Sequence, residues 1–189
     1  AGGTILIGGD YQGKNANIQN GRVSYVGPNA TLTVDATDAG SGGRAIVWAD
    51  QSTYFAGTLT ARGGINGADG GFAETSGKGT LIVRRAPDVS ARRNGRPGTW
   101  LLDPTDFTIG GVNAGFQDND PGPNFLYQST GGATSTIDIA TLRAALLTGN
   151  VTITTASAAA AAGNITWTNT GAPLDINTIG TKTLTLTAN

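Results

Sequence analysis

The sequence predicts an all-β fold in which short strands stack as the windings of a β-solenoid, and three observations support this prediction. Glycine makes up 30 of the 189 residues and charged residues only 13%, and the glycines alternate with β-formers rather than with the charges of a disordered chain. Short apolar runs follow Gly43, Gly71 and Gly98 at intervals of 28 and 27 residues, as in repeat architectures. In ATLTVDA (30–36), apolar and Thr side chains alternate with the period of a half-buried strand.

A short strand is expected in each run and would pair with its copy in the next winding, because one winding cannot bury its own inward-facing side chains. Glycine and asparagine between the runs are expected to supply positive-φ corners. The expected strands are VSYV (23–26), ATLTVDA (30–36), TYFAGTLTA (53–61), TLIV (80–83), VTITT (151–155), NITWT (164–168), LDINT (174–178) and TLTLTA (183–188). A sandwich of antiparallel hairpins is the structural alternative.

The chain divides into three segments. Residues 1–109 form the repeated windings, 110–136 form an extruded loop rich in Gly, Asn, Asp and Pro, and 137–189 form a short helix followed by further strands. The helix is expected at 139–148, with Asp138 as its cap and a Gly-Asn stop after it. Its apolar residues at helical spacing are Ile139, Leu142, Ala145 and Leu146. The Ala-rich connector at 156–162 predicts no definite element.

The composition excludes several classes of function. The chain contains no His, Cys or Met, which excludes Ser-His-Asp and Cys-His catalysis, imidazole or thiolate metal sites and disulfides. Any function must therefore rest on carboxylates, hydroxyls, amides, guanidinium groups and shape. Our leading prediction includes no catalytic residue, cofactor or metal ion. The formal charge of -1 gives no reason to expect nucleic acid as a partner. The chain starts at Ala1 within a strand-like run, which favours a piece of a longer, exported protein.

Four stretches resemble a known family. GGRAIVWADQSTYFAGTLTARGGINGADGGFAETSGKGTL (42–81) and GTWLLDPTDFTI (98–109) resemble the repeat region of filamentous-haemagglutinin-like adhesins, which are exported by two-partner secretion. GGDYQGKN (8–15) and YVGPNATLTVDAT (25–37) resemble the segment that precedes it. The resemblance implies a right-handed parallel β-helix, secreted to a Gram-negative bacterial surface with the help of an outer-membrane transporter. It also implies adhesion to host cells, other bacteria or matrix polysaccharide.

The leading functional prediction is therefore a non-enzymatic segment that provides reach and adhesion. An anion or acidic-glycan patch is its candidate contact, because guanidinium groups bind carboxylate and sulfate bidentately. The patch residues are Arg84, Arg85, Arg92, Arg93 and Arg96. A solvated loop whose arginines deter strand association is the structural alternative. Open solenoid ends would also permit end-to-end self-association.

A carbohydrate-active β-helix, acting as a polysaccharide lyase or glycosidase, is the second prediction. Glu74, Asp103 and Asp106 are its candidate acids, because such chemistry needs two carboxyl groups about 5 to 10 Å apart. Asp103 precedes Pro104, where an Asx turn or cap is the more usual role. An ice-binding solenoid is the third prediction, from the recurring Thr-x-Thr pairs, for which strand propensity is the simpler interpretation.

Three further groups have a simple structural interpretation beside a functional one. Asp118, Asp120 and Asn124 offer oxygen ligands for Ca²⁺, but their spacing matches no calcium motif and favours a hydrated turn. The tryptophans Trp48, Trp100 and Trp167 could stack on sugars, but their apolar neighbours favour core packing or stacking between windings. The Asn-x-Thr sequons begin at Asn29, Asn150 and Asn164 and are either glycosylation sites or buried corners.

Overall fold

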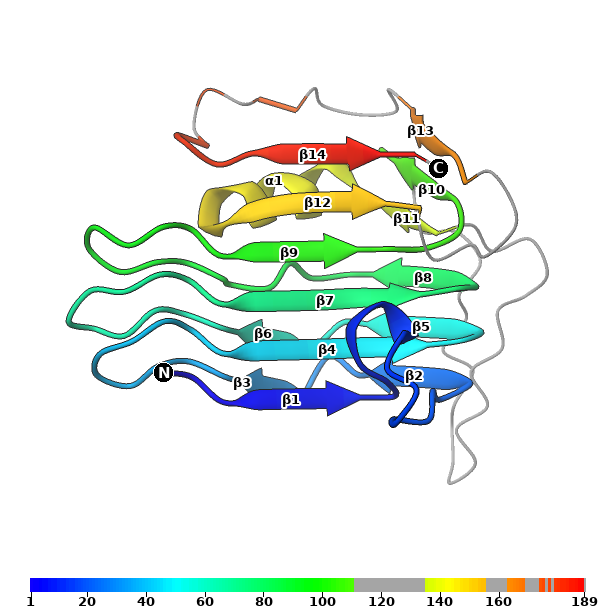
Figure 1. The fold of residues 1–189 in the computed structure, drawn as a ribbon. Coiled ribbons are helices and arrows are strands. Elements are labelled where there is room, and N and C mark those ends of the chain that lie inside the picture. Colours follow the sequence, from blue (N-terminus) through cyan, green and yellow to red (C-terminus); the bar gives the residue numbers. More distant parts are fainter. Residues whose placement is uncertain (111–134, 156–162, 169–173, 176, 178, 189) are drawn as a thin grey trace.

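The computed structural model of the protein describes residues 1–110, 135–155, 163–168, 174–175, 177 and 179–188. Within these ranges the chain consists mainly of strands in three sheets, with one α-helix and one short 3-10 helix (Figure 1). Every pairing between these strands is parallel. The all-β prediction is confirmed, and the antiparallel sandwich is wrong because its strands would run in opposite directions.

The first sheet contains six strands stacked along one direction (Figure 1). In spatial order they are β1 (Thr4–Ile7), β4 (Arg44–Ala49), β7 (Phe72–Gly77), β9 (Thr99–Leu102), β12 (Asn150–Thr154) and β14 (Leu184–Thr187). Arg44 lies opposite Phe72, and Phe72 lies opposite Thr99. These partners reproduce the intervals of 28 and 27 residues that the glycines predict.

After β1 and β4 the chain runs through the second and third sheets in turn, and after β7, β9 and β12 it enters the second sheet. The second contains β13 (Ile165–Trp167), β10 (Phe107–Ile109), β11 (Thr136–Ile137), β8 (Thr80–Val83), β5 (Ser52–Phe55) and β2 (Val23–Val26), in that order. The third pairs β3 (Thr31–Thr33) with β6 (Thr58–Thr60), and Asp88 adds an isolated bridge to Thr60. We call each strand of the first sheet, with the chain that follows it up to the next strand of that sheet, a pass. The first pass contains β1, β2 and β3, the second contains β4, β5 and β6, and the third contains β7 and β8.

The stacking order departs from the chain order at one place. β11 follows β10 along the chain, yet it lies between β10 and β8 in the second sheet. Thr136 of β11 lies opposite both Thr108 and Ile82. The end of the predicted 110–136 loop is therefore part of a sheet, whereas its residues 111–134, with Asp118, Asp120 and Asn124, lie outside the described residues.

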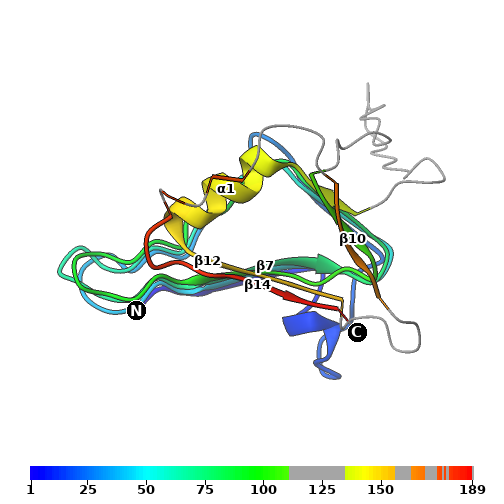
Figure 2. The ribbon, with the colours of Figure 1, turned by 90° about the horizontal axis from the view of Figure 1, so that it is seen from above.

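The core fills the space that the three sheets enclose (Figure 2). It is built from alternate residues of the strands, because successive side chains of a strand point to opposite faces. Equivalent positions of successive passes stack on one another there, as for Val47 and Thr75 in the first sheet and Phe55 and Val83 in the second. The largest fully buried core side chains are Trp100, Phe55, Phe107, Leu59, Leu81, Leu102, Ile109, Ile137, Leu142 and Leu146.

The glycine pairs mark close approaches between passes. An added Cβ would lie 2.0 Å from the Gly3 carbonyl oxygen at Gly43, and 2.2 Å from the Gly43 carbonyl oxygen at Gly71. Left-handed φ angles occur at other glycines, such as Gly40 and Gly67. No asparagine in the described ranges has a positive φ. The prediction that asparagines supply the corners is therefore wrong for this part of the chain.

The helix α1 (Ile139–Thr148) has the predicted bounds. Asp138 caps it, because its Oδ1 accepts a 2.7 Å hydrogen bond from the Thr141 backbone N–H. The buried residues of the helix are Leu142, Ala145 and Leu146. Gly149 ends it in an extended conformation, and a Cβ there would lie 2.2 Å from Cγ2 of Val89. The helix thus packs onto the end of the third-sheet segment of the preceding pass (Figure 2).

Two expectations for the C-terminal part are wrong. Leu174 and Asp175 of the expected 174–178 strand lie outside any strand, because Oδ1 of Asp175 accepts a 2.9 Å hydrogen bond from the Asn177 N–H in an Asx turn. Trp167 is 44% exposed rather than in the core. Trp167 lies opposite Ile109 of the adjacent strand, so the expected stacking between windings is formed, but β13 is the last strand of its sheet among the described residues. The connector at 156–162 lies outside the described residues.

Candidate functional site

Residues 8–20 form a covering loop on the outer face of the first sheet (Figure 2). The loop contains the 3-10 helix η1 (Tyr11–Gly13), where Gln12 and Gly13 have left-handed φ angles of 53° and 61°. An added Cβ at Gly9 or Gly13 would lie 2.6 or 2.4 Å from the Trp48 ring. Glycine at these two positions lets the loop backbone lie directly on that indole.

The covering loop buries apolar residues that point away from the core. Ile46 and Trp48 of β4 are fully buried, although the neighbouring Ala45 and Val47 are the residues that face the core. The sequence contains a signal for this burial. RAIVWA (44–49) has consecutive apolar residues, whereas a half-buried strand alternates apolar and polar residues. Such a run is typical of a strand that is buried on both faces.

Two carboxyl groups lie fully buried beneath the same loop. Glu74, the only glutamate of the chain, lies on β7, and Asp103 follows β9. The Gln12 backbone N–H donates a 3.0 Å hydrogen bond to Oε1 of Glu74, and Gln12 Nε2 donates one of 2.7 Å to Oδ2 of Asp103. The Asp103 N–H in turn donates to Oγ of Ser76 at 3.0 Å. One residue of the loop therefore holds both acids.

The surroundings of Glu74 favour its neutral form. Burial is the main cause that raises the pKa of Glu74 to about 7, and the Asp103 carboxylate adds to it. The hydrogen bonds from Gln12 and Ser76 and the charge of Arg44 oppose this rise. Oε2 of Glu74 has no hydrogen-bond partner among the described residues, and neither do Oδ1 of Asn20 and Nε1 of Trp48. All three atoms belong to the covering loop or to the sheet face below it.

The structure brings together two of the three acids considered for catalysis. Glu74 and Asp103 share the Gln12 contact, whereas Asp106 is exposed and accepts a 2.9 Å hydrogen bond from the Asn164 backbone N–H. A buried carboxyl group with a pKa near neutrality suits proton transfer. Both buried acids are closed off from solvent, however, so no substrate reaches them in this conformation.

The five arginines of the predicted patch are all exposed and lie at two corners of the third pass. Arg84 and Arg85 follow β8, and Arg85 Nη1 donates a 2.5 Å hydrogen bond to Oγ1 of Thr58. The other three, Arg92, Arg93 and Arg96, lie in the loop between the third and first sheets. There the Arg96 N–H donates a 2.7 Å hydrogen bond to Oδ1 of Asp69.

An aromatic and charged hollow of about 510 Å³ lies at the edge of the covering loop. Its lining residues are Asp10, Tyr11, Lys14, Asn15, Arg44 and Phe72. The rings of Tyr11 and Phe72 are 5.9 Å apart between centroids and tilted by 51°. The Arg44 guanidinium carbon lies 5.6 and 5.9 Å from these two centroids, and Nη2 donates a 2.9 Å hydrogen bond to Oδ1 of Asp10. Sequence reasoning missed this hollow, because its residues come from three passes.

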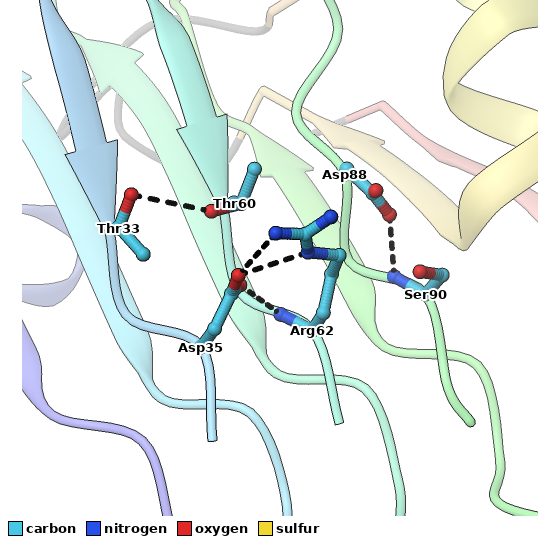
Figure 3. A network of polar contacts seen from close by, with 6 residues as sticks. All are labelled: Thr33, Asp35, Thr60, Arg62, Asp88 and Ser90. Atoms are coloured by element: carbon cyan, nitrogen blue, oxygen red, sulfur yellow. Dashed lines mark hydrogen bonds and ion pairs between the residues drawn. The ribbon is translucent and has the colours of Figure 1, made fainter. Parts of the chain in front are cut away.

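A second polar network links adjacent passes at the third sheet (Figure 3). Arg62 binds the Asp35 carboxylate through Nε and Nη2 at 2.9 and 2.6 Å, and its backbone N–H donates to Oδ1 at 2.7 Å. Burial raises the pKa of Asp35, but the hydrogen bonds from Arg62 outweigh it and hold the pKa below its usual value. The Thr33 and Thr60 hydroxyls lie 3.5 Å apart. This network holds neighbouring passes together.

The Thr-x-Thr pairs stack in register on short ladders. Thr31 lies opposite Thr58, and Thr152 lies opposite Thr185. The deepest ladder in the described ranges joins Thr136, Thr108 and Thr166 across three strands. The Thr ladders in the described part of the chain are therefore two or three strands deep.

The remaining candidates differ in exposure. Trp48 and Trp100 are fully buried, as expected, and Trp100 Nε1 donates a 3.0 Å hydrogen bond to Oγ1 of Thr75. Two sequon asparagines, Asn29 and Asn164, are exposed. The third, Asn150, is partly buried, and its Oδ1 accepts a 3.0 Å hydrogen bond from the Thr183 N–H.

Comparison with known proteins adds no family assignment to this geometry. No protein family matches the chain, and a search of curated proteins finds no similar sequence. None of the helices in the described part of the chain is long and apolar enough to cross a membrane. The described residues also form no group of three or more His, Cys, Asp or Glu side chains that could hold a metal ion.

Proposed function

We propose that this chain is a structural and adhesive segment of a large secreted bacterial surface adhesin, in which the three parallel sheets form a right-handed parallel β-helix. In this role the chain extends a stalk and presents loop side chains to host cells, other bacteria or matrix polysaccharide. It does not catalyse a reaction, and an outer-membrane transporter exports it. The resemblance of 42–81 and 98–109 to filamentous-haemagglutinin repeats supports this proposal.

The register of the first sheet is the observation that carries the proposal. Its strands stack in chain order from β1 to β14, and equivalent residues lie opposite one another. A stack of this kind grows along one axis by adding passes, because each strand of the first sheet pairs only with the strands of the adjacent passes. Added passes lengthen the molecule without requiring a separate hydrophobic core, which suits a protein that must extend away from the cell surface.

The terminal strands support self-association as part of the same function. β1 and β2 lie at one end of their sheets, and β14 and β13 lie at the other. The end strands expose apolar side chains that align with core residues, namely Trp167 opposite Ile109 and Leu186 opposite Ile153. Such an end offers backbone groups and apolar surface to a further parallel pass or to a second copy.

An adhesion assay with coated beads tests the proposal. Beads that carry the 189-residue chain should adhere several-fold more than albumin-coated beads to epithelial cells, bacteria or an alginate surface. A matched chain with all five patch arginines changed to Gln tests whether the predicted patch is the contact. Adhesion no higher than that of albumin beads on all three surfaces would overturn the adhesive function.

The second candidate, a carbohydrate-active enzyme, is favoured by the proximity of Glu74 and Asp103 to Gln12. It would require the covering loop to open and admit a sugar chain. Incubation with pectin, alginate and hyaluronan decides between the two candidates. New reducing or unsaturated ends that disappear in the Glu74→Gln variant would favour the enzyme, and their absence in the wild type would favour the adhesin.

A further inference from the structure

The hollow beside the covering loop continues into a second hollow on the same face. Arg44 and Phe72 line both hollows, and the second has a volume of about 550 Å³. Its lining includes the stacked glycines at the start of the first sheet, such as Gly43 and Gly71, and it reaches Arg96. We call the two together the outer groove.

The outer groove has an excess of positive charge. Its cations are Lys14, Arg44 and Arg96, and its acids are Asp10 and Asp69. Asp10 is already bound, because its carboxylate accepts hydrogen bonds from Arg44, from the Asn15 amide at 2.8 Å and from the Tyr11 N–H at 2.7 Å. Lys14 forms no ion pair among the described residues.

Lys14 is held in place from inside the protein. Its Nζ donates a 2.8 Å hydrogen bond to Oε1 of Gln12, whose Nε2 donates to the buried Asp103. The Gln12 backbone is bound to Glu74 in turn. The two buried acids are therefore positioning residues for a cation at the surface. A cation held before binding loses less conformational freedom when a ligand arrives.

The aromatic edge of the groove is accessible. Tyr11 is 44% exposed, and one side of its ring contacts Phe72 at a centroid distance of 5.9 Å. A sugar presents a C–H face that packs on such a ring and hydroxyl groups that bind charged side chains at its rim. The hollow beside Tyr11 is wide open to solvent, so a chain-like ligand can lie across it.

We propose that the outer groove binds an acidic polysaccharide, with one uronic acid unit in the hollow beside Tyr11. The carboxylate of that unit pairs with Lys14, its ring packs on Tyr11, and Arg44 binds its hydroxyl groups. Further units run toward Arg96 over the stacked glycines, whose lack of side chains leaves a depression in the surface. This inference rests on the proposed adhesive function and assigns its glycan contact to a site that includes only one arginine of the predicted patch.

Titration calorimetry of the full chain with tri-galacturonate tests the inference. The fully methyl-esterified trisaccharide has the same size without the charge and should bind about tenfold more weakly, as for the loss of one charged hydrogen bond. Lys14→Met and Tyr11→Ala should each weaken the binding of tri-galacturonate by about tenfold. Both side chains are exposed, so these variants should fold, which near-ultraviolet circular dichroism checks. The matched control, Arg84→Gln with Arg85→Gln, removes two exposed cations outside the groove and should bind as the wild type does.

Three results would overturn the inference. No binding of tri-galacturonate at millimolar concentration would exclude the site, while the bead assay would still decide the adhesive function. Binding lost in the Arg84→Gln, Arg85→Gln variant but kept in Lys14→Met would move the contact to the other corner and leave the proposed function intact. Equal affinity for hexaglutamate would show recognition of charge alone and exclude a sugar site.

Discussion

Gln12 Nε2 donates a 2.7 Å hydrogen bond to Oδ2 of Asp103, although 91 residues separate the two in sequence. The backbone N–H of the same glutamine holds Glu74, on a different strand. The covering loop, β7 and the end of β9 therefore share one contact point. Because removing a partner from a buried carboxylate is costly, loop closure and the stability of the first sheet are coupled.

Gln12→Ala is expected to lower the free energy of unfolding by about 2 kcal/mol, because it removes a charge-assisted hydrogen bond from buried Asp103. The loop should then lie less tightly on Trp48, whose fluorescence should shift to the red. Urea unfolding followed by fluorescence measures both effects. Gln51→Ala, at an exposed glutamine, is the control and should change little. Unchanged stability and emission in Gln12→Ala would show that this contact does not hold the loop.

Stability should fall as the pH rises through neutrality. The folded pKa of Glu74 is raised to about 7 from 4.5, so the folded state binds this proton more tightly than the unfolded chain. Its contribution to stability is complete below pH 4.5 and is lost as the pH rises through 7. Glu74→Gln should therefore be more stable than the wild type above pH 7 by about 3 kcal/mol.

The pH effect is measured by urea unfolding of both proteins at several pH values. Asp10, Asp35 and Asp50 have lowered pKa values and contribute stability that is lost in acid, but they do so equally in both proteins. The difference between the two proteins should vanish below pH 4.5. Asp38→Asn, at an exposed carboxylate, is the matched control. Parallel curves for Glu74→Gln and the wild type across the range would contradict the prediction.

Gly43→Ala is expected to destabilise the protein by about 3 kcal/mol or more, because its Cβ would lie 2.0 Å from a backbone oxygen that cannot move without shifting the neighbouring pass. Gly3→Ala is the matched control in the preceding pass, where an added Cβ meets no atom within 4 Å. Thermal unfolding of the two variants should separate them clearly. Equal melting temperatures would show that the passes adjust to a side chain at this position.

The Asp35–Arg62 pair should contribute about 1 kcal/mol, because two guanidinium N–H groups donate to Oδ2 of Asp35 but the pair is partly exposed. A double-mutant cycle with Asp35→Asn and Arg62→Met measures this coupling. The coupling should shrink in high salt, and it should also shrink as the pH falls below the usual aspartate range. The more exposed Asp50–Lys78 pair is the comparison and should couple more weakly. A coupling free energy of zero at low salt would show that the Asp35–Arg62 pair does not stabilise the fold.

The strands and the helix were predictable because their signals are local. Alternation in VSYV (23–26) and the cap at Asp138 act over a few residues, and the glycine intervals report the register directly. The role of the glycine pairs was not predictable. A glycine that allows close approach between passes looks the same in the sequence as a glycine that allows a positive-φ corner. The exposure of Trp167 was not predictable, because the strand pattern gives the face on which a residue lies but not whether another strand covers that face.

The candidate site was harder to predict because it is assembled across passes. Glu74 and Asp103 were recognised as acids, but their burial depends on a loop that lies 62 and 91 residues away in sequence. The one usable signal was the uninterrupted apolar run at 44–49, which indicates cover on both faces. Nothing local indicates that Gln12 supplies that cover.

The contacts between glycine backbones also define how such a gene can change in length. Gly43, Gly71 and Gly98 each need the carbonyl of the residue one repeat earlier at close range. A tandem duplication or deletion of a full repeat preserves this spacing, whereas a shift of one or two codons inside a strand places a side chain where no room exists. Related chains of different length should therefore differ by whole repeats, or by insertions between strands of different sheets, such as residues 8–20 between β1 and β2.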